Sequence, residues 1–414
     1  MGMKSESHCP DGWEVRAVRE LGEVIAGKAL AATAPGHMRP YLRTKNVFDG
    51  RIVVDDVLEM PMTDEQFETF RIRKGDVLLN EGQSLELVGR CSIYAEEYPE
   101  PCAIQNALLR FRAKPGVSAQ FASYVFRNCQ KTGSFAKIAL QTTSVAHLGV
   151  SRFADLQLAW PKKEVEQERI ANALSDVDDL IAGLERLIAK KRDIKQAAMQ
   201  QLLAGRTRLP GFSGEWVEAC LEEIAQIEMG QSPSSVNYNV RREGLPLIQG
   251  NADVRKRRTI KRIFTTQVTK RGRKGDVLMS VRAPVGEISR ATFDCCLGRG
   301  VCAIRFPNDF LYHALINLEP RWSRMSKGST FDSVNSTDVA NAIVALPSDP
   351  AEQAAIAAIL TDMDADLSTL ESRLAKTRAI KQGMMQELLT GRTRLVGIAH
   401  ETAPKKPETQ SQDA

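Results

Sequence analysis

The sequence lacks the features that mark several large classes of protein. It contains no run of 18 apolar residues, so no segment is long enough for a transmembrane helix. Its first ten residues, MGMKSESHCP, lack the apolar stretch of a secretory signal, so we expect a cytoplasmic protein without a membrane partner. Cysteines are sparse, eight in 414 residues, and none forms a C-x-x-C pair, which favours reduced thiols over a disulfide framework.

The sequence also lacks a recognisable catalytic pattern. It has no G-x-x-x-x-G-K-[ST] phosphate loop, no G-x-G-x-x-G after a strand and no N/D-P-P-aromatic motif of amino methyltransferases. Cys295, Cys296 and Cys302 with His313 lack zinc-site spacing. We therefore expect no catalytic residue, no metal site and no cofactor in this chain.

One nuclease-like pattern is present, but its position argues against catalysis. Asp193-Ile194-Lys195 fits the D/E-x-K of restriction nucleases. It lies in the middle of an expected long helix, and the second copy of that helix reads Ala379-Ile380-Lys381. We interpret these residues as part of the helix.

What the sequence does have is an ordinary globular balance, with 43% hydrophobic and 26% charged residues. At roughly 150 residues per domain, the length allows two or three domains. The net charge is +5, from 56 basic and 51 acidic residues, which permits a polyanionic partner without requiring one.

A segment of 50 residues occurs twice. Residues 161–210 and 347–396 align without a gap at a constant offset of 186, and 25 of the 50 positions are identical. The densest part is IKQAAMQQLLAGRTRL (194–209) against IKQGMMQELLTGRTRL (380–395). The chain therefore contains an internal repeat, which predicts two related halves with pseudo-twofold symmetry.

Each copy predicts one long helix. Ser348, Asp349 and Pro350 are typical of a helix start, and Gly205 and Gly391 of a left-handed residue that ends one. Between these signals lie about 40 residues, or about 60 Å of helix.

Apolar residues in both copies repeat in steps of four and three, the period of a left-handed coiled coil, and we expect the two helices to pair with each other. The predicted seam consists of Ile170, Leu174, Val177, Ile181, Leu184 and Ile188, and of Ile356, Leu360, Met363, Leu367, Leu370 and Leu374. Basic residues are expected on the outer faces, at Lys190, Lys191, Arg192, Lys195, Lys376, Arg378 and Lys381.

The two segments outside the long helices are each predicted to form a mixed α+β head with a small sheet. RKGDVLLNEG (73–82) resembles RKGDVLMSVR (273–282), and the short apolar runs 77–79, 277–279 and 301–306 are typical of strands. The expected order is a first head (1–160), a helix (161–209), a second head (210–346), a helix (347–397) and a disordered tail (398–414). We call residues 1–160 the first head and 210–346 the second head.

Basic residues concentrate in the second head, where no acidic residue interrupts them. This favours contact with DNA phosphates, although a solvated surface remains an alternative. The candidate phosphate contacts are Arg255, Lys256, Arg257, Arg258, Lys261, Arg262, Lys270, Arg271, Arg273 and Lys274. Weaker candidates in the first head are Arg39, Arg43 and Lys45.

Polar side chains on Gly-rich loops are candidates for reading bases, since Asn or Gln pairs with adenine and Arg with guanine in the major groove. For each of them, a role in turn structure is an equal alternative. The candidates are Gln231, Gln249, Asn251, Arg282, Arg299 and Thr330 in the second head, and Asn46, Asn80, Gln83, Arg90, Thr142 and Thr143 in the first.

The helical motifs carry a family resemblance. WPKKEVEQERIANALSDVDDLI (160–181) and LPSDPAEQAAIAAILTDMDADL (346–367), each followed by the GRTRL ending, resemble the specificity subunit of type I restriction–modification systems. The resemblance covers the chain up to about residue 397. The helical motifs are specific, whereas the RKGDV motifs of the heads are much less so.

The resemblance implies a function. Each head would be a target-recognition domain that reads half of a bipartite double-stranded DNA site. The helices would form an antiparallel coiled coil that sets the gap and docks two methyltransferase subunits. Restriction subunits would add ATP-driven translocation and cleavage, so S-adenosylmethionine, ATP and Mg²⁺ would belong to the partners. The alternatives are a coiled-coil scaffold, a stand-alone DNA-binding regulator, or an enzyme whose site has no recognisable motif.

Overall fold

Two compact units make up the protein. The computed structural model describes residues 9–141, 144–326 and 333–395. Unit 1 comprises Met1–Gly183 and Ala375–Ala414, and unit 2 comprises Leu184–Leu374. Each unit thus combines one head with half of each long helix, a grouping that the linear order of heads and helices does not reveal.

The two long helices begin and end where the sequence signals place them. Helix α6 spans Glu164–Leu202 and helix α10 spans Pro350–Leu388. Asp349 accepts a hydrogen bond on Oδ1 from the Ala351 N–H over 2.8 Å at the start of α10. Gly205 and Gly391, just beyond the two helices, adopt φ of 65° and 72°, the left-handed conformation that glycine allows.

In the described part of the first head, short strands form five small sheets, and the helices are four to thirteen residues long. In chain order they are β1 Trp13–Ala17, α1 Val18–Leu21, β2 Gly22–Ala26, β3 His37–Leu42, β4 Val47–Phe48, β5 Arg51–Ile52, β6 Leu58–Met62, α2 Asp64–Phe70, β7 Val77–Asn80, β8 Gly82–Gln83, β9 Cys91–Ile93, β10 Ala103–Ile104, β11 Leu108–Ala113, α3 Ala119–Lys131, α4 Ser134–Ile138, β12 Leu140–Gln141, β13 Ala146–His147, α5 Val150–Ala154 and β14 Gln157–Pro161.

The second head has a similar series of elements. They are β15 Trp216–Cys220, α7 Leu221–Ile224, β16 Gln226–Met229, η1 Ser235–Asn237, β17 Tyr238–Asn239, β18 Leu245–Ile248, η2 Asn251–Asp253, β19 Val254–Arg255, β20 Arg258–Thr259, β21 Ile263–Thr265, β22 Arg271–Gly272, β23 Val277–Ser280, β24 Ile288–Arg290, β25 Cys295–Leu297, β26 Val301–Arg305, α8 Phe310–Ser326, α9 Ser336–Ala340 and β27 Ile343–Pro347.

The two heads share their strand order. The first head has a sheet β2-β11-β7-β9, and the second head has the matching order β16-β26-β23-β24. A second sheet runs β10-β3-β6 in the first head and contains β25-β18-β21 in the second, with a parallel pair in each. In both heads the first and last strands pair, β1 with β14 and β15 with β27. The expected mixed α+β class is therefore confirmed for both heads.

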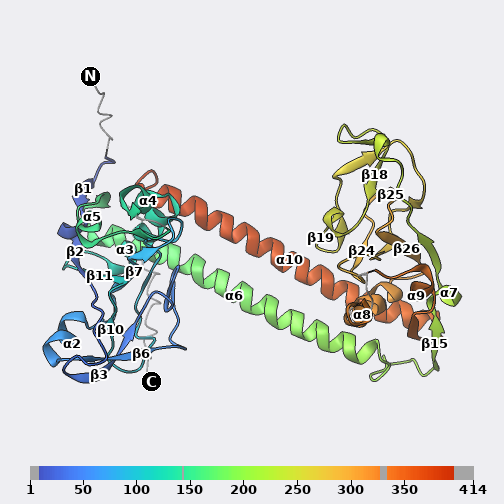
Figure 1. The fold of residues 1–414 in the computed structure, drawn as a ribbon, viewed down its shortest axis with the longest axis horizontal. Helices are drawn as coiled ribbons and strands as arrows, with labels where there is room; N and C mark the ends of the chain where they lie inside the picture. The colour runs from blue at the N-terminus through green and yellow to red at the C-terminus, as the bar shows by residue number, and fades with distance from the viewer. Residues whose placement is uncertain (1–8, 142–143, 327–332, 396–414) are drawn as a thin grey trace, which may run out of the picture. The chain divides into compact units, whose positions relative to one another are not determined.

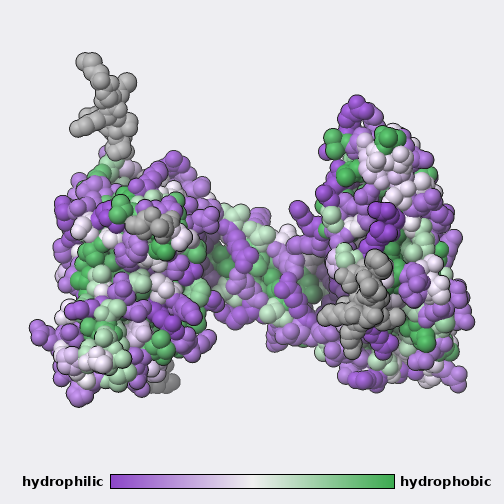
Figure 2. Space-filling view, viewed as in Figure 1, coloured by the Kyte–Doolittle hydropathy of each residue, from purple (hydrophilic) through white to green (hydrophobic). Residues whose placement is uncertain are grey.

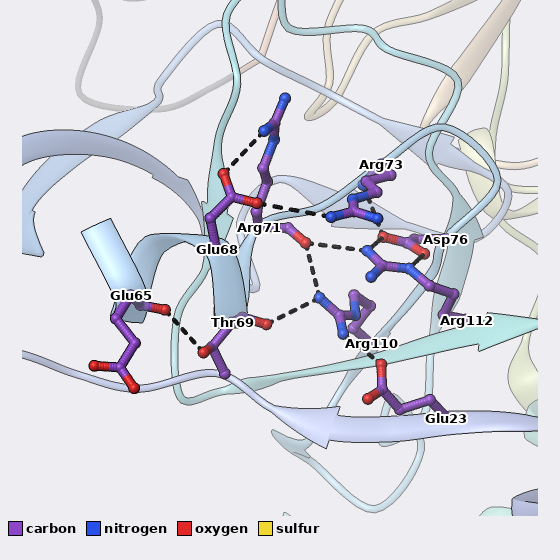
Figure 3. A network of polar contacts seen from close by, with 9 residues as sticks. All are labelled: Glu23, Glu65, Glu68, Thr69, Arg71, Arg73, Asp76, Arg110 and Arg112. Carbon is purple, nitrogen blue, oxygen red and sulfur yellow. Dashed lines mark hydrogen bonds and ion pairs between the residues drawn. The ribbon is translucent and has the colours of Figure 1, made fainter. Parts of the chain in front are cut away.

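The repeated RKGDV motif forms the turn that precedes a central strand. Asp76 accepts the Arg73 N–H over 2.7 Å, and Asp276 accepts the Arg273 N–H over 2.9 Å. Figure 3 shows Asp76 among the arginines around it, where Arg112 donates to both of its carboxylate oxygens over 2.8 and 2.7 Å. The motif is thus a structural device, since its buried carboxylate is satisfied by the turn and by one arginine.

The ends of both long helices belong to the cores of the heads. In unit 1, α6 begins and α10 ends beside the first head (Figure 1). The first core unites buried residues of the head, such as Phe121 and Trp160, with Leu174 of α6 and Leu388 of α10. The second core holds Leu202 of α6, together with residues at the start of α10. Each head therefore folds around two helix segments that are distant in sequence.

Candidate nucleic-acid interface

A β-hairpin carries the first four basic residues of the second head, 255–258. Strands β19 and β20 pair, and Lys256 and Arg257 form the tip with φ of 49° and 57°. Arg257 donates to both carboxylate oxygens of Glu319 in α8, over 2.8 Å in one of the two contacts. Lys256 lies 3.0 Å from the Glu371 carboxylate in α10. The tip of this hairpin thus contacts helices rather than facing solvent alone.

Half of the ten basic residues are neutralised within unit 2. Besides the two at the tip, three lie beside a carboxylate: Arg262 at 3.1 Å from Asp253, Lys270 at 2.6 Å from Glu228, and Arg271 at 2.8 Å from Asp294. Ion pairs of this kind reduce the charge that a phosphate meets.

The remaining basic residues differ in their availability. Lys261 lies over the Phe293 ring, 5.0 Å from its centroid. Four others are exposed, and their side chains have no hydrogen bond or ion pair within the described ranges. These four are Arg255, Arg258, Arg273 and Lys274. They are the cations best placed to meet a phosphate.

The first-head phosphate candidates are partly neutralised. Arg39 donates to Asp64 over 2.9 Å and lies over the Phe67 ring, and Arg43 is paired with Asp56. Lys45 is exposed. Among the phosphate candidates, the second head therefore has more unpaired cations than the first.

The structure gathers several base-reading candidates of the first head around one hollow. It has a volume of about 360 Å³, and its lining includes Lys45, Asn46, Gln83 and Arg90. Asn46 is buried and holds the loop together, since its Nδ2 donates to the Val53 and Asp56 carbonyls over 2.9 and 3.1 Å. Lys45, Gln83 and Arg90 are left to meet a ligand.

Other candidates serve the fold or lie elsewhere. Asn80 is buried and donates to the Val47 carbonyl over 3.1 Å. Gln249 donates to the Tyr238 hydroxyl over 2.9 Å, which leaves only part of its amide free. The exposed candidates of the second head are Gln231, Arg282 and Arg299. Thr142, Thr143 and Thr330 lie outside the described residues.

None of the predicted seam positions is fully exposed. Each of the twelve apolar residues is buried or half-buried. Those nearest the helix starts, such as Ile170 and Ile356, belong to the cores of the heads. Part of the predicted seam therefore packs in the cores of the heads.

Four of the basic residues expected on the outer faces instead reach the other long helix of the same unit, among them Arg192, which lies 2.6 Å from Glu371 in unit 2. In unit 2, Lys191 lies 3.0 Å from Asp366, and Lys195 lies 2.5 Å from Asp364. In unit 1, Lys381 is paired with Asp178. The expectation of an outward basic face was wrong for these residues, because acidic side chains on the facing helix attract them.

Sequence reasoning missed a buried ion pair that occurs in both units. Arg394 donates to both oxygens of Glu166 over 2.5 and 2.8 Å, and Arg208 does the same to Glu352 over 2.7 and 2.6 Å. Both carboxylates are buried. The signal was available, because an E-Q pair near each helix start and the GRTRL ending occur in both copies. Each helix ending thus anchors the start of the other helix.

The thiols are structural. Burial raises the pKa of Cys295 and Cys302 to about 12, so neither is a thiolate at neutral pH. All eight cysteines are free, and within the described ranges no cluster of His, Cys, Asp or Glu fits a metal ion. No helix in the described part of the chain could span a membrane.

Hydrophilic side chains dominate the viewed face of both units (Figure 2).

Asp193 and Ile194 are exposed in the middle of α6. The nuclease-like tripeptide is therefore part of a helix surface, as the sequence predicted.

The chain matches known proteins along most of its length. The sequence model of the family described as type I restriction modification DNA specificity domain matches residues 10–191 and again residues 213–378. The MjaX type I restriction enzyme specificity subunit of Methanocaldococcus jannaschii is 27% identical over 409 residues, which cover 93% of this chain and 95% of that protein.

Solved structures share the fold. A chain from a structure of the type I R-M system, concerned with complex assembly and conformational transition, has a TM-score of 0.60 at 24% identity and covers 93% of this chain and 99% of that chain. The S subunit of a type I restriction-modification system from M. genitalium has a TM-score of 0.61 at 17% identity, with 93% and 98% covered.

Proposed function

The chain belongs to the family of type I restriction-modification specificity subunits, and from this premise we propose that its two heads read the two halves of one bipartite DNA sequence. The observation that carries the proposal is the double match of the family to residues 10–191 and 213–378, on two heads with the same strand order. A scaffold that never touches DNA would need neither the repeated heads nor the unpaired cations.

The two half-sequences differ, because the heads present different surfaces from the same framework. The hairpin tip of the first head carries Asp49, which lies 2.6 Å from Arg127 of α3. The tip of the second head carries Lys256 and Arg257, which contact carboxylates instead. Heads with different loops require different bases, so the complete site is asymmetric.

The two long helices form an antiparallel coiled coil that spaces the half-sites, with pseudo-twofold symmetry between the halves. The seam in steps of four and three supports this arrangement, as do the ion pairs between α6 and α10 within each unit. A spacer of fixed length holds the unread gap constant, since two reading heads must match the DNA helical repeat of about 10 base pairs.

The chain acts without catalysis of its own, as a DNA-recognition subunit. Two methyltransferase subunits dock on it and bring S-adenosylmethionine, and restriction subunits bring ATP and Mg²⁺. We place this assembly in the cytoplasm, where the DNA is.

The test is methylome sequencing of cells that contain the methyltransferase subunits, with and without this gene. The expected result is adenine methylation at one asymmetric gapped sequence that disappears without the gene. Unchanged methylation, together with failure of the chain to co-purify with a methyltransferase subunit, would contradict the proposal. Tight sequence-specific DNA binding by the chain without any partner would favour a stand-alone regulator instead.

A further inference from the structure

One position of the shared framework carries opposite chemistry in the two heads. In the first head, the backbone N–H of Asn80 donates to the carbonyl of Arg90 over 2.9 Å. In the second head, the N–H of Ser280 donates to the carbonyl of Glu287 over 3.0 Å. Asn80 and Ser280 end the matching strands β7 and β23. This backbone pairing makes Arg90 and Glu287 structural equivalents.

The glycine before each of these residues supports the equivalence. Gly89 and Gly286 both have positive φ, 76° and 86°. A Cβ at Gly89 would lie 2.1 Å from the Phe135 ring, and a Cβ at Gly286 would lie 2.4 Å from the Trp322 side chain. Both loops are therefore fixed against a core aromatic residue, and the next side chain is presented from a rigid backbone.

Arg90 projects from this loop with unused donors. Its guanidinium lies over the Phe48 ring, 4.8 Å from the centroid, at the hollow of about 360 Å³. Its Nε is buried without a hydrogen-bond partner, and no carboxylate bonds its side chain within the described ranges. Burial lowers the pKa of this guanidinium below its ordinary value, although the Asp49 charge opposes the shift. Arg90 is thus a partly desolvated cation that gains from a polar acceptor.

The charge of the hollow does not select a phosphate as that acceptor. Its lining carries Asp55 and Asp56 as well as Lys45, and Asp56 is paired with Arg43. Guanine presents two neutral acceptors, N7 and O6, that match the fork of an arginine. Gln83 in the same lining offers both a donor and an acceptor to a neighbouring base.

The Glu287 side chain offers hydrogen-bond acceptors where Arg90 offers donors. Asn251 donates from Nδ2 to the Glu287 carboxylate and holds it in place, and within the described ranges that side chain has no other hydrogen-bond partner. A carboxylate repels phosphate, but it accepts from the exocyclic amino group of a base. The equivalent loop of the second head thus suits a base edge and not the DNA backbone.

We propose that positions 90 and 287 are equivalent base-reading positions of opposite hydrogen-bond polarity. Arg90 donates to the acceptor edge of a guanine in one half-site, and Glu287 accepts from an exocyclic amino group, cytosine N4 or adenine N6, in the other. This inference rests on the proposed function, because it requires that each head faces one half-site.

The test is methylome sequencing of the complete methyltransferase complex with single variants of this chain. Arg90→Met keeps an unbranched side chain over Phe48 and removes every donor. The expected result is loss of guanine preference at one position of one half-site, by about 5- to 140-fold, which corresponds to about 1–3 kcal/mol for a bidentate base contact. Glu287→Gln is expected to change one position of the other half-site only. The gap is unchanged in both.

Matched controls separate base reading from general effects. Arg51→Met removes an equal charge beside the same aromatic ring, since the Arg51 guanidinium also lies over Phe48, 5.4 Å from the ring centroid. Glu222→Gln removes an exposed carboxylate from α7. Both controls are expected to keep the wild-type sequence preference. Arg90→Lys retains the charge but not the fork, and is expected to relax the same position as Arg90→Met.

Several outcomes would overturn the inference. One is a wild-type sequence preference in Arg90→Met, and another is uniformly weaker methylation in Arg90→Met with full preference in Arg90→Lys, which indicates a phosphate contact. In both cases the wild-type complex still methylates a gapped asymmetric sequence, so the proposed function stands. If the wild-type complex methylates no such sequence, the proposed function itself fails.

Discussion

At the residue scale, equivalent positions in the two units hold the heads against the long helices with different side chains. In unit 1, the Tyr124 hydroxyl donates to Asp178 of α6 over 2.9 Å. In unit 2, the corresponding residue is His313, whose Nε2 lies 3.0 Å from the Thr361 hydroxyl and whose Nδ1 lies 4.0 Å from Asp364. Each residue lies three positions after a buried phenylalanine, Phe121 in α3 and Phe310 in α8.

The histidine makes the stability of unit 2 depend on pH. Burial lowers the pKa of His313 to about 4, and Lys195 and Arg290 lower it further against the opposing charges of Asp364 and Asp309. An unfolded histidine titrates at about 6.5, so the unfolded state binds more protons between those two values. The stability contributed by neutral His313 is therefore complete above about pH 6.5 and is lost as the pH falls toward 4.

We predict that His313→Tyr reduces this acid sensitivity. Tyrosine at this position reproduces the side chain of the first head and carries no charge change in the same pH range. The expected result is a flatter dependence of unit 2 stability between pH 6.5 and 4, where the wild type loses on the order of 3 kcal/mol. Hydrogen exchange of β23 and β26 at both pH values measures it, with β7 and β11 of unit 1 as the internal control. An equally steep loss in the variant would contradict the prediction.

The sequence identified candidate DNA-contacting residues, but it did not reveal which of their side chains are free to contact DNA. From the basic stretch, Arg257 and Arg258 were equally good candidates for a phosphate contact. Arg257 is bound by Glu319, which lies 62 residues further along the chain, whereas Arg258 is exposed. No local pattern reveals a partner at that separation. The same reason explains why Asn46 was a candidate for reading bases, although its amide holds the loop around Val53.

At the element scale, the long helices were predictable and the short strands were not. Proline and aspartate signals marked the start of α10, and the two left-handed glycines marked the ends of α6 and α10. The central strands β7, β23 and β26 were also expected within one residue at each end. Two-residue strands such as β8 and β10 depend on tertiary pairing, so no periodicity announces them.

Helix ends that complete the core of a head lead to a prediction about distant coupling. Leu388 belongs to α10, which follows the second head in the chain, but it packs in the core of the first head and is 6% exposed. Leu388→Ala is expected to destabilise unit 1 by about 2–4 kcal/mol, because it removes buried methyl groups and leaves a cavity. Leu202→Ala in α6 is the mirror variant and is expected to destabilise unit 2.

Hydrogen exchange with mass spectrometry distinguishes the two variants. Leu388→Ala is expected to reduce protection of β2, β7 and β11, and Leu202→Ala that of β16, β23 and β26. The opposite assignment, or an equal loss in both heads from either variant, would show that the helix ends do not belong to separate cores.

At the scale of the whole molecule, the repeat was visible in the sequence, but its pairing of segments was not. The offset of 186 revealed two copies of one helix, and the similar RKGDV motifs revealed two related heads. The sequence order places each head before its own helix. The contacts instead join each head to the start of one helix and the end of the other, as the Arg394–Glu166 and Arg208–Glu352 pairs illustrate. Such pairing is long-range, so linear patterns do not contain it.

A spacer built from both helices predicts how the recognised sequence responds to helix length. We predict that four residues inserted after Gly183 in α6 and four after Leu374 in α10 lengthen the unread gap while both half-sites are preserved. Four residues add about 6 Å of helix, which corresponds to less than two base pairs at about 3.4 Å each. A four-residue insertion is a stutter, which unwinds the coiled coil locally, while the apolar positions on either side of it keep their spacing in steps of four and three.

Methylome sequencing of the complex with this variant measures the gap directly. The control inserts the same four residues at Gly211, in the exposed connection between α6 and β15, where the helix length is unchanged and the gap is expected to remain that of the wild type. An unchanged gap in the helix variant would separate gap length from helix length, and the spacing would then have to come from the heads or from the partner subunits. A changed half-site would show that the helices also orient the loops that read bases.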